Sequence, residues 1–187
     1  MTAGDLCTLA DVKAFLSITD TNNDALLGTL ITNASKLVNN ATNRNLLSAS
    51  YTESYSGRGG WRQGVDNYPI TAVASVTVDG VSIAPASGQI GAGYIYDENM
   101  VYLRGYTYTR GIRNVEITYT AGYDAAAIPA DLVQATVEIV AVKFKRRLSL
   151  EVSGKTLNGE TISFVTSDIP ASAKGVLKQY TRRFTNA

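Results

Sequence analysis

Histidine is absent from the 187 residues, and cysteine occurs once, at Cys7. Without histidine, Ser-His-Asp and Cys-His catalysis and the usual zinc ligand sets are excluded. A single cysteine excludes a disulfide framework within the chain. We therefore predict no catalytic, metal-binding or cofactor-binding residue. An enzyme that works without histidine stays open as an alternative, although no pair of carboxylates in the sequence indicates an acid–base couple.

Long apolar runs are missing too. No segment approaches the roughly 20 apolar residues that span a bilayer. The N-terminus has no basic stretch followed by an apolar core, so neither a membrane partner nor a signal peptide is expected. With 45% apolar and 18% charged residues, the composition is typical of a globular chain long enough for one sizeable core.

The net charge of +1 hides an uneven distribution along the chain. Residues 1–50 carry a net charge of −1, residues 51–131 carry −3, and residues 132–187 carry +5. A phosphate backbone or an acidic protein partner is therefore expected to contact the last third of the chain.

The stretch Ile128–Arg147 predicts a central helix. Pro129 stands at its entrance, where a missing N–H costs little, and Asp131 puts a negative charge in the first turn. One wide face collects Leu132, Val133, Thr136, Val137, Val140, Ala141, Phe144 and Leu148. Few polar residues remain for the opposite side. We expect a helix covered on more than one side, either by its own domain alone or also by a neighbouring subunit.

Three further helices are predicted. The first begins at Thr8, where Thr-Leu-Ala-Asp is typical of an N-cap, and continues through Leu16. The second covers about 24–42, where apolar residues recur at three- and four-residue spacing. A short last helix begins at Pro170, and the tail after it, Phe184–Ala187, is expected to be loose without a partner.

Residues 51–120 change to the alternation of strands. Asp79-Gly80 and the turn 97–99 each lie between two short β-type runs and predict hairpins. Residues 114–120 alternate as a half-buried strand, and Thr52–Ser56 forms a weaker one before a flexible glycine-rich stretch. We predict one antiparallel sheet of about five short strands. Asn158-Gly159 predicts a further, projecting hairpin within 149–168.

The fold class is therefore α+β: a helical-bundle core of about four helices, with an inserted small antiparallel β-sheet and a projecting hairpin before the C-terminal helix. We treat the chain as one domain, 1–187. Its predicted parts are N-terminal helices at 1–50, the inserted β region at 51–123, the central helix at 124–148, the hairpin arm at 149–169, and the C-terminal helix and tail at 170–187.

Two surfaces are candidates for binding. Lys143, Lys145, Arg146 and Arg147 end the central helix; they suit DNA or an acidic partner, or only the helix dipole and solvent. The segment Arg104–Arg113 interleaves three arginines with two tyrosines. Such a segment could stack on bases or form a protein interface, and we favour a protein contact or a plain exposed hairpin.

Two motifs match ligand sites only in part. Asp20–Asp24 begins like a calcium loop, but Ala25 stands where glycine is needed and Ile31 where the bidentate glutamate is needed. The glycine-rich run 88–93 precedes a predicted strand, whereas a phosphate-binding loop needs a helix N-terminus.

The order of these motifs resembles the head–tail connector (adaptor) proteins of long-tailed bacteriophages. The resemblance covers nearly the whole chain. It is carried by the leading Thr8–Leu16 helix, Tyr68-Pro69-Ile70 before the 73–80 strand, Val115–Tyr123 before the long helix, and the Gly159–Ser163 hairpin with the last helix.

This resemblance implies a structural protein of the virion neck, assembled in the bacterial host cytoplasm. It implies a homo-oligomeric ring of twelve copies beneath the portal protein, with packaged double-stranded DNA passing through the lumen. A stopper or tail-completion protein is the implied neighbour, and such a neck component is also the alternative function. The docking arms are the Gly57–Gly64 loop, the 149–168 hairpin and the tail from Arg182. The residues expected to dock are Arg58, Trp61, Lys155, Leu157, Asn158, Arg182, Arg183 and Phe184.

Overall fold

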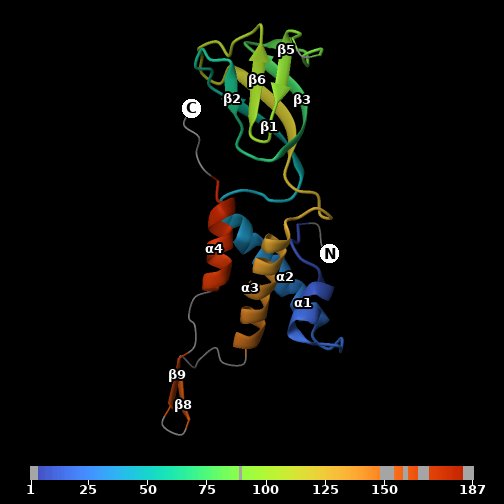
Figure 1. Cartoon of the computed structure of the whole chain (residues 1–187), viewed down its shortest axis with the longest axis vertical. Coiled ribbons are helices and arrows are strands. Elements are labelled where there is room, and N and C mark those ends of the chain that lie inside the picture. The colour runs from blue at the N-terminus through green and yellow to red at the C-terminus, as the bar shows by residue number, and fades with distance from the viewer. Residues whose placement is uncertain (1–3, 89, 148–153, 158–159, 164–168, 183–187) are drawn as a thin grey trace. The chain divides into compact units, whose positions relative to one another are not determined.

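A computed structural model describes residues 4–88, 90–147, 154–157, 160–163 and 169–182, with the backbone alone in 154–157 and 160–163. These residues form four helices, two small antiparallel sheets and a separate hairpin, which is an α+β fold (Figure 1). Contacts group the chain into two compact units. The helical unit is Met1–Asn43 with Ile128–Arg182, and the β unit contains Arg44–Ala127.

The helical unit contains α1 (Leu9–Leu16), α2 (Asp24–Thr42), α3 (Ala130–Arg146) and α4 (Ala171–Tyr180), which confirms the four predicted helices. Local chemistry explains their ends. Thr8 and Asp11 each accept a hydrogen bond from the other's backbone N–H, and this capping box begins α1. Asn43 adopts the left-handed conformation that ends α2. Lys13 of α1 forms an ion pair of 2.8 Å with Asp24 at the start of α2.

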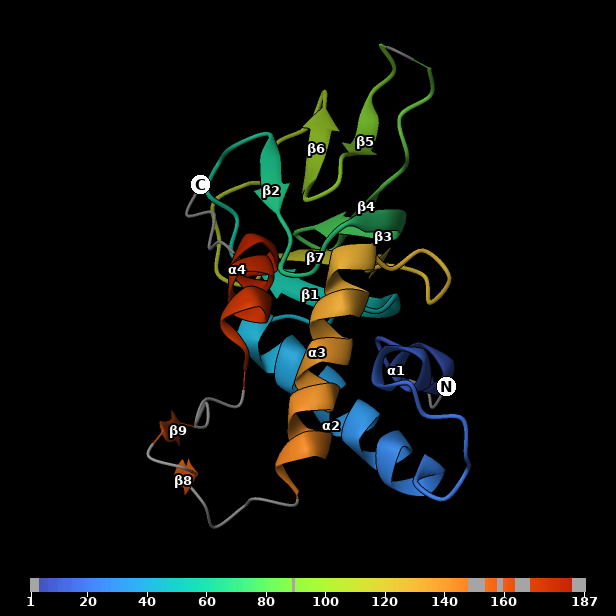
Figure 2. The ribbon, with the colours of Figure 1, turned by 60° about the horizontal axis from the view of Figure 1, so that its bottom comes forward.

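Helix α3 contacts α1, α2 and α4, and it lies between α1 and α4 in both views (Figures 1 and 2). Its buried residues are Leu132, Ala135, Thr136, Val137, Ile139, Val140, Ala141 and Phe144. The predicted cover on more than one side is therefore supplied by the chain's own helices. Helix α4 runs antiparallel to α3, because the Ser172 hydroxyl donates to Glu138 and the Tyr180 hydroxyl donates to Asp131 at 2.9 Å.

The larger sheet of the β unit has the strand order β1-β7-β3-β4. Its strands are β1 (Ala49–Tyr55), β3 (Ile70–Val78), β4 (Val81–Ile83) and β7 (Val115–Ala121). Asp79 and Gly80 both have positive φ, at 51° and 79°, as the predicted two-residue turn between β3 and β4 requires. Strand β7 pairs with both β1 and β3, which joins strands far apart in the sequence.

A second sheet has the order β2-β6-β5, with β2 (Arg62–Gly64), β5 (Gly93–Tyr96) and β6 (Met100–Arg104) (Figure 2). The prediction of one sheet of about five strands is therefore wrong. The β5–β6 hairpin was predicted, but it pairs with β2, which lies in the Gly57–Gly64 loop that we predicted as a docking arm. Strand β2 has no β-branched residue; its backbone ladder to β6 makes it a strand.

The core of the β unit combines residues of both sheets. Tyr108, Tyr119, Val76, Val101 and Ile117 are among its buried residues. The predicted hairpin before α4 is confirmed as β8 (Gly154–Leu157) paired antiparallel with β9 (Glu160–Ser163). Its predicted turn residues, Asn158 and Gly159, lie outside the described residues.

Candidate interaction surfaces

The basic cluster predicted at the end of α3 combines partly buried and exposed side chains. Lys143 and Arg146 are partly buried, and Lys145 and Arg147 are exposed. The Arg147 guanidinium lies 3.6 Å from the centre of the Phe144 ring and donates a hydrogen bond of 3.0 Å to the Phe144 carbonyl. Arg147 therefore binds the C-terminal end of its own helix, as the helix-dipole interpretation expects. Binding of DNA by the cluster stays a prediction.

The Gly57–Gly64 loop is bonded to the β unit through its backbone. The Gly59 N–H donates to the Tyr108 carbonyl, and the Tyr108 N–H donates to the Gly60 carbonyl, both at 2.7 Å. The Gly57 N–H donates to Asn114 Oδ1 at 2.9 Å. These bonds fix the backbone of the loop to the β unit. A contact of Arg58 or Trp61 with a neighbouring protein stays a prediction.

The outer face of the second sheet carries aromatic and basic side chains. Trp61 is 57% exposed, and its ring stacks on Tyr102 with the ring centres 5.5 Å apart. Arg62 is exposed and pairs with Tyr102 across the strands, so both side chains lie on the same face. Tryptophan, tyrosine and arginine are enriched at protein interfaces. This face is a candidate contact surface.

The segment Arg104–Arg113 differs from its predicted appearance. Tyr108 is only 1% exposed, and its hydroxyl donates to the Val101 carbonyl at 3.2 Å, so it is a core residue that no base can reach. Burial raises its pKa, which keeps the hydroxyl protonated. Tyr106 is exposed, and Ile112, at 90% exposure, lies between the exposed residues Arg110 and Arg113. The segment is a surface of arginines around an isoleucine.

A cluster of one carboxylate and two tyrosines was not predicted. Glu53 accepts hydrogen bonds from the hydroxyls of Tyr55 and Tyr119, and from the side-chain amide of Asn67 at 3.0 Å. Desolvation, followed by the hydrogen bond to Glu53, raises the pKa of both tyrosines. Both hydroxyls stay protonated as donors, so the cluster fastens the segment before β3 to strands β1 and β7. The alternation of β1 places Glu53 and Tyr55 on one face and is the only sequence signal for it.

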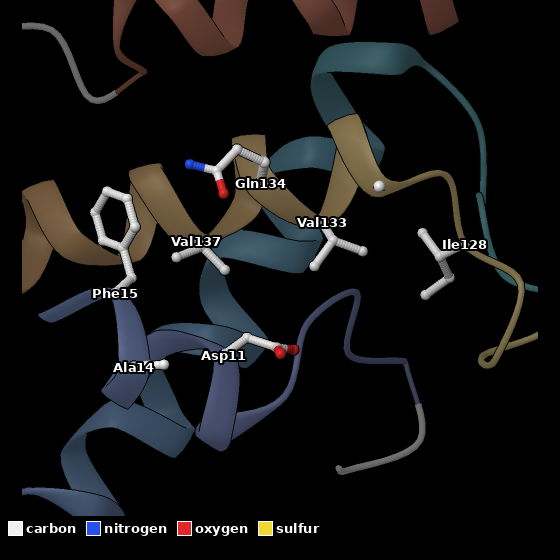
Figure 3. A pocket seen from close by; sticks show the side chains of 8 residues that line it. Asp11, Ala14, Phe15, Ile128, Val133, Gln134 and Val137 are labelled. Carbon is white, nitrogen blue, oxygen red and sulfur yellow. The ribbon is translucent and has the colours of Figure 1, made fainter. Parts of the chain in front are cut away.

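The helical unit also has a groove that was not predicted (Figure 3). Asp11, Ala14 and Phe15 of α1 face Val133, Gln134 and Val137 of α3 across a volume of about 440 Å³. Phe15 is 48% exposed, so the groove has an apolar rim on the side of α1.

The remaining predicted docking residues are only partly described. Lys155 and Leu157 belong to β8, and Asn158, Arg183 and Phe184 lie outside the described residues. The Arg182 N–H donates to the Thr42 carbonyl at 2.9 Å, which ties the end of α4 to the end of α2.

The described part of the chain contains no group of three histidine, cysteine, aspartate or glutamate residues placed to hold a metal ion. None of its helices combines the length and the apolar character needed to cross a membrane.

Comparison with known proteins gives one family and several similar structures. The family model described as head completion protein (HCP) matches residues 5–184. No curated protein matches the chain. A chain of the neck of an empty gene transfer agent (GTA) particle, computed with C6 symmetry, matches with a TM-score of 0.59 at 19% identity, covering 97% of this chain and 93% of that one.

Two further structures give similar matches. A chain of the neck of the native GTA particle, computed with C12 symmetry, has a TM-score of 0.59 at 19% identity, over 96% of this chain and 91% of that one. A chain of the virion of the native GTA particle has a TM-score of 0.61 at 19% identity, over 97% and 93%. At 19% sequence identity, these matches show a shared fold.

Proposed function

Because the chain belongs to the head completion protein family, we propose that it is a structural protein of a phage neck that joins the DNA-filled head to the tail. The match over residues 5–184 carries this proposal, since it includes every helix and strand of the described residues. The fold agrees with it, because chains of similar fold occur in the necks of phage-like particles. We infer a structural role in the virion, without catalysis, and assembly in the host cytoplasm.

We propose that the protein functions as a homo-oligomeric ring. The similar neck structures were computed with C6 and C12 symmetry, and twelve copies beneath a portal protein is the arrangement that we propose. A closed ring needs a heterologous contact, in which two different surfaces of one subunit meet. We propose that the helical unit forms the bundle core of the ring and that a neighbouring subunit adds to the cover of α3.

The neck partners are proposed to be the portal protein on one side and a stopper or tail-completion protein on the other. Arg58 and Trp61, the 149–168 hairpin and the tail from Arg182 are the proposed docking sites. The family description, head completion, also suits a neighbouring neck component such as a stopper. This is the alternative within the same class of structural proteins.

Mass measurement of the purified chain, alone and mixed with its portal protein, tests the proposal. A ring in solution or a ring bound to the portal supports the connector role. A chain that stays monomeric and ignores the portal contradicts it. A chain that binds only an assembled connector–portal complex supports the stopper alternative.

The basic cluster at the end of α3 is proposed to line the DNA channel. The proposed attraction to the DNA phosphates is electrostatic, because four positive side chains lie within about one and a half helical turns. These are Lys143, Lys145, Arg146 and Arg147. Replacing all four with glutamine is expected to reduce DNA retention in assembled particles, measured as the fraction of DNA-filled heads. Lys36→Gln, an exposed change on α2, is the control. Unchanged DNA retention would remove the channel role and leave the ring proposal standing.

A further inference from the structure

The β unit carries two surfaces of opposite charge at the two ends of strand β3. One is the arginine patch, formed by Arg110, Ile112 and Arg113. The other is the acidic turn, formed by Asp97 and Glu98 between β5 and β6. All five residues are exposed. Surfaces of opposite charge are electrostatically complementary and can bind each other.

Hydrogen bonds hold the arginine patch together. The Arg110 Nε donates to the Arg58 carbonyl at 3.4 Å, and the Gly111 N–H donates to the Gly57 carbonyl at 3.2 Å. The Arg113 N–H donates to Ser56 Oγ at 3.1 Å. These bonds place two distant segments side by side, with Ile112 90% exposed between arginines. The patch is therefore formed before any partner arrives, which lowers the entropy that binding must offset.

The charge of the arginine patch is only partly offset. No aspartate or glutamate occurs in residues 54–65 or 99–115. The neighbouring carboxylate is Asp79, which accepts hydrogen bonds from the Thr109 hydroxyl and the Asn114 side-chain amide. These bonds hold the pKa of Asp79 below its ordinary value, so it stays charged. Arg110 and Arg113 together outnumber this carboxylate, so the patch is positive.

The acidic turn is the counterpart. No lysine or arginine occurs in residues 63–103. The Ile70 N–H donates to the Glu98 carbonyl at 2.7 Å, and the Val65 N–H donates to the Asn99 carbonyl at 3.1 Å, so the turn is fixed by its backbone. Asp97 accepts a hydrogen bond from the Tyr102 hydroxyl. The turn therefore presents two carboxylates on an ordered backbone.

Strand β3 sets the separation of the two surfaces. Ile70, its first residue, is bonded to the acidic turn, and Asp79, directly after its last residue, accepts the Thr109 and Asn114 bonds beside the arginine patch. Nine residues of strand place the surfaces roughly 25 Å apart. Two complementary surfaces that lie apart on one subunit cannot pair within that subunit. They can pair between copies, head to tail, and repeated contacts of this kind form a ring.

We propose that the arginine patch of one copy binds the acidic turn of the next copy, so that the β units form a charged contact around the ring. This inference rests on the proposed ring and adds to it the side chains that join adjacent copies. A second copy is favoured over DNA or another acidic protein because this chain carries both halves of the contact. Ile112 supplies an apolar contact at its centre.

Charge reversal and charge exchange test the contact in the full chain. Arg113→Glu and the double variant Arg110→Glu with Arg113→Glu are expected to weaken ring formation roughly tenfold or more at about 0.1 M salt, because like charges then meet. Adding Asp97→Lys and Glu98→Lys to the double variant is expected to restore it. Lys36→Glu, a charge reversal at an exposed site of α2, is the control and leaves the ring intact. Native mass spectrometry, alone and on the portal, gives the readout.

Each outcome separates the two proposals. A wild-type ring that survives the double reversal overturns the charged contact and leaves the connector role. A ring lost on reversal but not restored by exchange also overturns it, since the patch then binds DNA or another acidic protein. If the wild type forms no ring alone or on the portal, the connector proposal fails and the contact fails with it.

A covalent test does not depend on the strength of the contact. A chain with both Ile112→Cys and Glu98→Cys is expected to form a ladder of disulfide-linked oligomers on mild oxidation. Chains with either cysteine alone should stay unlinked, because the contact is not symmetric. Buried Cys7 can be retained. Absence of the ladder in rings that form normally would overturn the contact.

Discussion

Single residues set the close approach that builds the arginine patch, and Gly57 is the clearest case. A Cβ atom at Gly57 would lie 1.9 Å from the Thr109 carbonyl oxygen, which is backbone and cannot rotate away. Gly57→Ala is therefore expected to lower the free energy of unfolding by about 1–3 kcal/mol, measured by urea unfolding. Gly60→Ala is the matched control, because nothing lies within 4 Å of its Cβ position. Equal unfolding curves for the two variants would contradict the close approach.

Cys7 allows a residue-scale test of burial in the helical unit. Desolvation, followed by the charges of Asp11 and Asp5, raises the pKa of its thiol to about 12 from the ordinary 9.0. At pH 8 the reactive thiolate is then roughly a thousandfold rarer than in the unfolded chain. Alkylation by iodoacetamide is expected to be slow in the folded protein and fast in urea. Fast alkylation of the folded protein would show that the segment before α1 opens readily.

Because the raised pKa favours the protonated thiol, Cys7 has a definite effect on stability at high pH. The contribution of the protonated thiol to the unfolding free energy is complete below pH 9.0, which is the pKa of the thiol in the unfolded chain. This contribution is lost as the pH rises towards about 12, the pKa in the folded protein. Cys7→Ala should remove this dependence. The difference in unfolding free energy between the two proteins is expected to shrink as the pH rises from 8 to 11.

At the scale of elements, the packing of α4 against α2 and α3 buries a small apolar face of α4. Leu177 is 3% exposed and Ala173 is 1% exposed, while the hydrogen bonds of Ser172 and Tyr180 lie near the ends of the helix. Leu177→Ala is expected to cost about 2–4 kcal/mol of stability, because a cavity remains in the contact. The same variant should also show faster amide hydrogen exchange in α4. Lys178→Ala, the exposed neighbour, should change neither quantity.

The elements with local signals could be predicted from the sequence. Thr8 and Asp11 mark the start of α1, Pro129 marks the start of α3, and Asp79-Gly80 marks the β3–β4 turn, since each of these acts on its own neighbours in the chain. Strand β2 could not be predicted. Its residues have little intrinsic strand preference, and its partner β6 lies about forty residues away.

The candidate surfaces depended even more on distant contacts. The basic residues at the end of α3 were identified as a cluster because one helix carries them all. The segment Arg104–Arg113 was identified from its composition, but its hydrogen bonds to Ser56 and Arg58, more than fifty residues away in the sequence, were not predicted. Tyr108 was assigned to the surface because alternation with exposed residues does not reveal that its ring enters the core. Tertiary packing decides such cases.

At the scale of the whole molecule, the two units differ in how many separate stretches of the sequence build them. The helical unit is built from two separate stretches of chain, whereas the β unit contains the continuous stretch Arg44–Ala127. The ends of that stretch are held together, since the Ser48 N–H donates to the Tyr123 carbonyl and the Tyr123 N–H donates to the Leu46 carbonyl. This arrangement is typical of an inserted unit with its own core.

The continuous stretch is therefore expected to fold when it is produced alone. A fragment of residues 44–127 retains both sheets and the buried residues from Val65 to Ala121, so it should show dispersed NMR amide signals and one cooperative urea transition. A fragment of residues 44–114 is the control. It lacks β7, which pairs with β1 on one side and β3 on the other, so it should remain unfolded. If the longer fragment is also unfolded, the β unit needs the helical residues to fold, and variants of the arginine patch must then be interpreted as changes to the whole chain.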